Sequence, residues 1–92
     1  MKEVSGALKS PDESAMKAGS DETYARFQEM LVEARKKSGL SQQEVADRLG
    51  RPQTYVSKCE LGTRRMDVVE FLEMAEVLGF DPVAFVKKLQ ST

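Results

Sequence analysis

The sequence contains no histidine and only one cysteine. Without histidine, the common zinc sites, a Ser-His-Asp triad and a Cys-His nucleophile pair are all excluded. A phosphate-binding glycine loop is also missing. We therefore expect a protein that is not an enzyme and that holds no metal and no cofactor. One cysteine cannot form an intrachain disulfide, which is typical of proteins in the reducing cytoplasm.

Long hydrophobic segments are missing as well. No apolar run approaches the roughly 18 residues that a membrane-spanning helix needs, and no signal-peptide core is visible. We expect a cytoplasmic protein that does not interact with a membrane. The length of 92 residues and the hydrophobic content of 40% are ordinary for one soluble globular domain.

Basic residues are not in excess, since the net charge is −1, although binding to DNA phosphate is dominated by Lys and Arg. Their distribution is nevertheless uneven. Residues 35–65 hold eight basic and three acidic residues, a net charge of +5, whereas residues 1–34 and 66–92 each carry −3. A basic stretch between acidic flanks is typical of a small DNA-binding module. The alternative is a randomly mixed surface.

Two short helix signals are present in residues 41–62. Ser41 and Glu44 have the spacing of a capping box, which predicts a helix from about Gln42 to Leu49. Gly50 then suits a sharp turn, because glycine adopts positive φ without steric cost. Two short helices held at one fixed angle can place the second one in a DNA major groove.

The second of these helices would begin with Pro52 at its first position and end near Glu60. Its outward face would carry Gln53, Thr54 and Lys58, whose side chains can contact adenine, thymine and guanine in the major groove. We assign these three residues to base reading; the alternative is that they are ordinary polar surface residues. The two helices would pack through side chains at helical spacing: Val45, Ala46, Leu49, Val56 and Cys59.

Three segments in this order, Ser-Gln-Gln-Glu-Val-Ala, Val-Ser-Lys-x-Glu-x-Gly and Ala-Glu-x-Leu-Gly, resemble the Cro/repressor-type (XRE) helix-turn-helix family. The resemblance covers about Tyr24 to Leu89. It implies an all-α, lambda-repressor-like domain of five helices, of which the second and third read DNA. It also implies a DNA-binding transcription regulator that usually acts as a dimer. The sequence departs from the family at Cys59, where a larger residue is usual, and at Arg51, where an apolar residue is frequent.

The resemblance also implies roles for individual residues. Gln53, Thr54 and Lys58 match base-reading positions. Arg35 and Glu60 match a partly buried ion pair between the first and third helices. We assign contacts with DNA phosphates to the polar residues around the proposed reading helix: Gln42, Arg51, Tyr55, Ser57, Arg64 and Arg65.

The flanking segments complete the expected fold. Residues 1–20 lack an apolar period and are predicted to form a flexible N-terminal tail, while residues 21–92 form the domain. The first helix would run from about Asp21 to Lys37 and bury Tyr24, Phe27, Leu31 and Ala34. The fourth would begin after Asp67, end at Gly79, and bury Val68, Phe71, Leu72, Ala75 and Leu78. Asp81 would cap a fifth helix that has Pro82 at its first position.

The last helix raises the question of assembly, because so small a domain can bury only part of its apolar surface. Candidates for a dimer seam are Phe80, Val83, Phe85, Val86 and Leu89; the alternative is that they close the core of one copy. We expect a repressor that binds double-stranded DNA, at a palindromic operator, as a homodimer. The alternatives are an antitoxin-type autorepressor with a protein partner, and a protein-interaction module that keeps the fold.

Overall fold

The computed structural model describes the backbone of residues 13–91 and the side chains of residues 22–91. Within these residues the chain forms α-helices joined by short turns. Five helices follow one another: α2 (Glu13–Ser38), α3 (Gln42–Leu49), α4 (Gln53–Leu61), α5 (Val68–Leu78) and α6 (Pro82–Gln90). The predicted all-α fold of five helices is confirmed.

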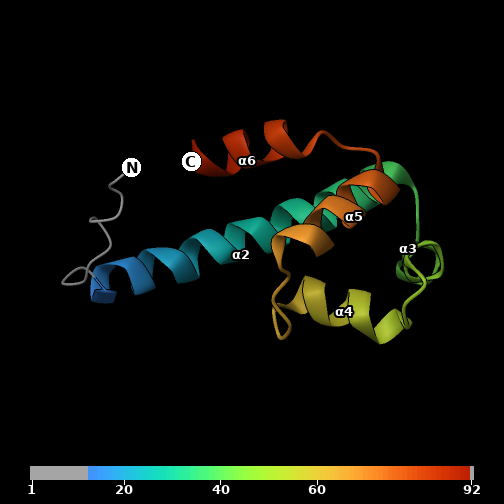
Figure 1. The fold of residues 1–92 in the computed structure, drawn as a ribbon, viewed down its shortest axis with the longest axis horizontal. Coiled ribbons are helices and arrows are strands. Elements are labelled where there is room, and N and C mark those ends of the chain that lie inside the picture. The colour runs from blue at the N-terminus through green and yellow to red at the C-terminus, as the bar shows by residue number, and fades with distance from the viewer. Residues whose placement is uncertain (1–12, 92) are drawn as a thin grey trace.

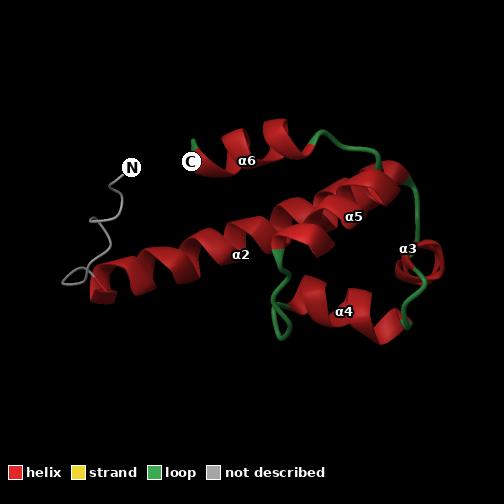
Figure 2. Cartoon of the chain, in the orientation of Figure 1, coloured by secondary structure: helices red, strands yellow, loops and turns green. Residues whose placement is uncertain are grey.

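The longest helix, α2, organises the domain (Figure 1). It packs against α4, α5 and α6, while α3 packs against α4 and α5. In the view of Figure 2, α4 and α6 lie on opposite sides of α2 and α5. The α3–α4 pair therefore forms one margin of the domain. None of the described helices is both long enough and apolar enough to cross a membrane.

The first described helix begins earlier than the sequence predicts. We expected a start near Asp21, whereas α2 begins at Glu13. Good helix formers such as Ala15, Met16 and Lys17 favour helix in this segment even though it lacks an apolar period. The remainder of the predicted tail, residues 1–12, lies outside the described residues. The division of the chain at residue 20 stays a prediction.

The ends of α3 and α5 are fixed by the same local chemistry. At α3, the Ser41 hydroxyl accepts from the Glu44 backbone N–H (3.1 Å), and a Glu44 carboxylate oxygen accepts from the Ser41 N–H (2.8 Å). Asp67 and Glu70 form the equivalent capping box at α5. These reciprocal bonds satisfy backbone donors that a helix start leaves unpaired. The predicted capping box of α3 is confirmed.

The predicted place of Pro52 in α4 is wrong by one residue. Pro52 precedes the helix as its N-cap, with φ −66° and an extended ψ of 153°. Its carbonyl accepts from the Tyr55 N–H at 2.9 Å, which begins the helix at Gln53. Proline fixes φ but leaves ψ free, so the residue suits either position. The turn from Gly50, whose φ is +70°, requires the extended one.

Small side chains bring α3 and α4 together. The residues fully buried at this contact are Val45, Ala46, Val56 and Cys59, as predicted. Aromatic rings fill the core between α2, α5 and α6. Phe27, Phe71, Phe80 and Phe85 form this group, with neighbouring ring centroids 4.7 to 5.7 Å apart.

The predicted burial of two residues on α5 is wrong. Val68 is 70% exposed and Leu72 is 50% exposed. The buried face of α5 contains Phe71, Met74 and Ala75 instead. Each residue turns the helix by about 100°, so Leu72 lies to the side of that buried face. Val68 is the first residue of α5 and lies at the end of the helix. These two side chains therefore contribute an apolar surface rather than core.

Candidate nucleic-acid interface

The three residues assigned to base reading lie on α4, at the margin of the domain. Thr54 and Lys58 are exposed, and Gln53 is half-buried. Thr54 and Lys58 are four residues apart, so their side chains lie on the same side of the helix. Ser57, one of the residues assigned to phosphate contact, lies between Thr54 and Lys58 in the sequence and is half-buried. The structure thus brings these four polar side chains together along one helix.

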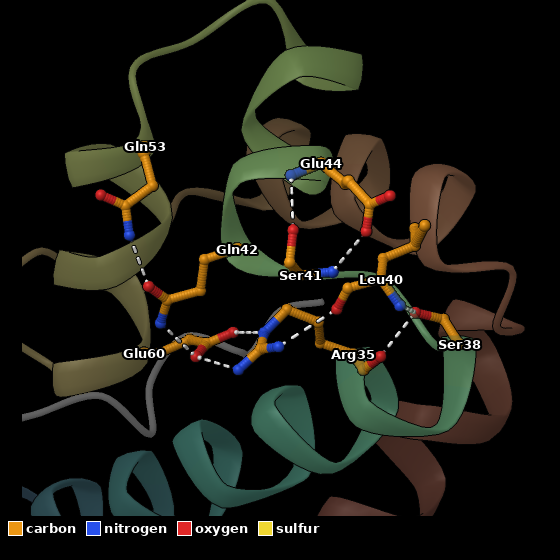
Figure 3. Close-up of polar contacts among 8 residues, drawn as sticks. All are labelled: Arg35, Ser38, Leu40, Ser41, Gln42, Glu44, Gln53 and Glu60. Carbon is orange, nitrogen blue, oxygen red and sulfur yellow. Dashed lines mark hydrogen bonds and ion pairs between the residues drawn. The ribbon is translucent and has the colours of Figure 1, made fainter.

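A chain of polar contacts connects α2 to the start of α4 (Figure 3). Arg35 binds Glu60 through two bonds, Nε to Oε2 at 2.6 Å and Nη2 to Oε1 at 3.1 Å. Gln42 donates its amide N–H to Glu60 Oε1 at 2.8 Å, and its own Oε1 accepts from Gln53 Nε2 at 2.6 Å. Arg35 also donates to the carbonyl of Leu40 at 3.1 Å. The expected ion pair between Arg35 and Glu60 is thus one end of a longer hydrogen-bond network that reaches Gln53.

This network has a defined direction. Glu60 can only accept, so Gln42 must present its NH₂ group to Glu60 and its oxygen to Gln53. Gln53 in turn must present its NH₂ group to Gln42, and its Oε1 points away from the network (Figure 3). The side chains of Arg35 and Glu60 are only 15% and 10% exposed, so this pair is partly desolvated. The hydrogen bond with Glu60 raises the pKa of Arg35.

Tyr55 is placed differently from the prediction. Its side chain belongs to the core, and the residue is only 8% exposed, which argues against the phosphate contact assigned to it. Two guanidinium groups lie over the Tyr55 ring, with Arg51 Cζ 4.5 Å and Arg64 Cζ 4.8 Å from its centroid. Burial raises the pKa of Tyr55 to about 12. The residue therefore serves as a platform for two cations.

The same two arginines share one carboxylate. Arg64 binds Glu70 with two bonds of 3.0 Å, and Arg51 approaches the same carboxylate at 3.5 Å. Arg51 also approaches Glu73 at 3.5 Å. The hydrogen bond from Arg64 lowers the pKa of Glu70. Arg51 and Arg64, two of the three arginines assigned to phosphate contact, are thus already engaged in ion pairs within the domain.

Arg65, which was also assigned to phosphate contact, is exposed after α4. Its guanidinium carbon lies 4.3 Å from the centroid of the Tyr24 ring. The Tyr24 hydroxyl accepts from the Met66 backbone N–H at 3.3 Å. Tyr24 therefore supports the loop that carries Arg65, a role that the sequence prediction missed.

Gln28 supports the other end of this loop and was also missed. Its Nε2 donates to the Glu60 carbonyl at 3.3 Å. Gly62, with φ +82°, lies directly over this side chain, and a Cβ there would come within 2.5 Å of Gln28 Oε1. In the sequence, Gly62 indicated only that a helix ends there. It gave no indication that Gln28 of α2 lies against this glycine.

The predicted dimer seam divides into two groups. Phe85 is buried and Phe80 is half-buried in the aromatic core, which favours the alternative that these two residues close the core of one copy. Val83 is 63% exposed and Val86 is 41% exposed, while Leu89 is half-buried. An apolar groove of about 430 Å³ runs between α2, α5 and α6 and is lined by residues such as Tyr24, Met66, Val68, Val86 and Leu89.

These features define the class of the protein: a five-helix domain in which α3 and α4 form a helix-turn-helix. Residues 29–85 match the model of a family of helix-turn-helix domains. An uncharacterized HTH-type transcriptional regulator of Sinorhizobium fredii, y4dJ, is 38% identical over 58 residues, which cover 63% of this chain and 75% of that protein.

A solved structure of an XRE-family like protein from Pseudomonas syringae pv. tomato is also similar. It has a TM-score of 0.81 and 43% sequence identity, over 84% of this chain and 94% of that chain. The chain therefore belongs to the XRE family of helix-turn-helix DNA-binding transcriptional regulators. It is a regulator and not an enzyme.

Proposed function

We propose that the protein is a sequence-specific repressor that places α4 in the major groove of its operator. The fixed amide of Gln53 is the observation that carries this proposal. With one N–H bound to Gln42, the amide can accept from adenine N6 through Oε1 and donate to N7 through its second N–H. Thr54 and Lys58, on the same margin of the domain, would contact neighbouring base pairs.

Contacts with the DNA backbone would hold this helix in register. Ser57 lies between Thr54 and Lys58 in the sequence, Arg65 lies in the loop after α4, and Gln42 can donate its second amide N–H to a phosphate. Such contacts position a protein on DNA without carrying sequence information. Occupancy of an operator is enough to block transcription, so repression needs no surface beyond this one. Such a repressor would act in the cytoplasm.

We further propose that two copies bind a palindrome. One α4 reads only a few base pairs, whereas two copies about 34 Å apart read two half-sites. The surface that favours a second copy is apolar and lies on α5 and α6, with its exposed members Val68, Leu72, Val83 and Val86. Self-complementary contact of one such patch with its own copy is the usual way to form a two-fold dimer.

The experiment that tests this function is selection from a random duplex DNA library, followed by affinity measurements at two salt concentrations. A palindromic consensus that is bound far more tightly than scrambled DNA is expected. Salt-sensitive binding without a consensus would contradict sequence-specific regulation. A consensus of one half-site, with a monomeric protein, would contradict the dimer. It would leave the apolar face to a different partner, as in an antitoxin-type autorepressor.

A further inference from the structure

Glu70 is the common partner of side chains that surround the proposed reading helix. Arg51 lies in the turn before α4, Tyr55 lies in its first turns, and Arg64 lies in the loop after it. Both guanidinium groups lie over the Tyr55 ring, and both bind Glu70 on α5. One carboxylate on a different helix thus holds the chain before and after α4.

Geometry and burial distinguish this carboxylate from its neighbour Glu73. The Glu70 side chain is 11% exposed and binds Arg64 in a bidentate manner at 3.0 Å. The Glu73 side chain is 48% exposed and approaches Arg51 at 3.5 Å, the same distance as Glu70, but it has no bidentate contact like the one between Glu70 and Arg64 among the described residues. Bidentate pairs of arginine and carboxylate fix orientation as well as distance, whereas exposed single contacts contribute little.

The contact also removes positive charge from the surface that would face DNA. Arg51 and Arg64 are 34% and 40% exposed, so they lie at the surface. Arginine side chains released there would bind phosphate at any sequence, because phosphate contacts do not depend on base identity. An arginine side chain that Glu70 holds on Tyr55 cannot move freely to reach phosphates along the DNA backbone.

We infer that Glu70 is a positioning residue for DNA specificity: it holds Arg51 and Arg64 against Tyr55, away from indiscriminate phosphate contact. This inference rests on the proposed DNA-binding function. A purely electrostatic role would have a different consequence for specificity, because the ratio of operator to scrambled affinity would not change. Removing an acidic charge near the interface would then strengthen binding to every DNA sequence alike.

The test uses the full chain with Glu70→Gln and measures affinity for the selected operator and for a scrambled duplex. Glutamine can still complete the capping box with Asp67, so the start of α5 is retained. We expect binding to scrambled DNA to gain up to two phosphate contacts. Each contact adds about 0.9 to the salt slope, so between 50 and 200 mM salt the scrambled-DNA affinity should fall about threefold more than that of the wild type for one contact and roughly tenfold more for two. The ratio of operator to scrambled affinity should drop, because base contacts fix α4 on the operator and leave the released arginines less to gain there.

Glu73→Gln is the matched control, because it removes the same charge one helical turn along α5. We expect its salt slope and its affinity ratio to stay close to those of the wild type. Glu70→Asp is the second test variant, since it keeps the charge but shortens the reach to Arg64. Its affinity ratio should also fall, which a charge effect does not predict. All assays are run below the lowest melting temperature of the set, so that every variant is folded.

Equal salt slopes and equal affinity ratios for Glu70→Gln and Glu73→Gln would overturn the inference. An unchanged affinity ratio for Glu70→Asp would also overturn the inference. If Glu70→Gln does not fold, the result for Glu70→Asp decides. Failure of the proposed function looks different. In that case the wild-type protein itself shows no preference for any sequence, and the comparison of variants has no operator to use.

Discussion

The α3–α4 half and the α5–α6 half of the domain expose different kinds of side chain. On α3 and α4, polar groups are held by hydrogen bonds to one another and to α2, in a chain that runs from Arg35 of α2 through Glu60 and Gln42 to Gln53. On α5 and α6, Val68 and Val83 are 70% and 63% exposed. A surface of fixed donors and acceptors suits base edges, whereas an aliphatic surface suits another protein. In the proposed function, the same small fold would therefore separate the surface that reads DNA from the surface that forms the dimer.

The largest effect is expected from a substitution in the apolar surface of α5 and α6, and the property it changes is dimerisation. Val86→Glu places a charge in the α5–α6 surface, and a two-fold contact would bring the charge of each copy into the seam. Burial of like charges costs several kcal/mol, so we expect the dimer to dissociate at micromolar concentration, as measured by sedimentation. Leu61→Glu, at a 70% exposed position on α4, is the control and should leave the dimer intact. Unchanged dimerisation in Val86→Glu would exclude this surface.

The next largest effect is expected from a substitution in the polar network, and the property it changes is the stability of the domain. Arg35→Ala leaves Glu60 without its cation in a site where that carboxylate is only 10% exposed. We expect a loss of about 2–4 kcal/mol and a melting temperature lower by roughly 10 °C or more in thermal unfolding. Lys36→Ala, at an exposed neighbouring position, should change little. An unchanged melting temperature together with lost DNA binding would show that Arg35 contacts DNA instead.

A smaller effect concerns the loop after α4. Gly50 and Gly62 both have positive φ, but only Gly62 has a neighbour, Gln28, within 4 Å of an added Cβ. Alanine should cost about 1–2 kcal/mol at either position from the left-handed backbone. Gly62→Ala should cost about 1 kcal/mol more in denaturant unfolding, because Gln28 must leave the Glu60 carbonyl. Equal losses at the two glycines would show that the Gln28 contact contributes nothing.

The smallest effect is a dependence on pH. The pKa of Glu70 is lowered by Arg64, so Glu70 contributes stability that is present above the ordinary glutamate pKa of about 4.3. This contribution is lost as pH falls through the lowered pKa of the folded state. The difference in melting temperature between the wild type and Glu70→Gln should therefore shrink in acid. A difference that stays constant between pH 7 and pH 3 would contradict the ion pair.

Local signals in the sequence predicted the local structure well. The Ser41 capping box and Gly50 define α3 because their bonding partners lie within a few residues. Helical periodicity was less reliable, since it placed Leu72 and Val68 in the core. Tyr55 was assigned to a DNA phosphate contact although it lies four residues before the buried Cys59, on the same side of the helix. That spacing could have corrected the prediction.

Contacts between distant segments were harder to predict. Arg35 and Glu60 are 25 residues apart, and only the resemblance to a known family paired them. Nothing in the local pattern connects Gln28 to Glu60 or Arg51 to Glu70, because these contacts depend on how helices cross. The polar network around Gln53 could therefore be described only after the helices had been placed in space.

The proposed function depends on Gln53, held by Gln42, reading a base. The most direct measurement compares wild type, Gln53→Ala and Gln43→Ala on the selected operator and on scrambled DNA. Gln43 is the matched control because it is an exposed glutamine on α3 that bonds Asp47 instead. We predict that Gln53→Ala loses about 1–3 kcal/mol on the operator only, while Gln43→Ala binds both DNAs as the wild type does. Equal losses of Gln53→Ala on the operator and on scrambled DNA would contradict base reading.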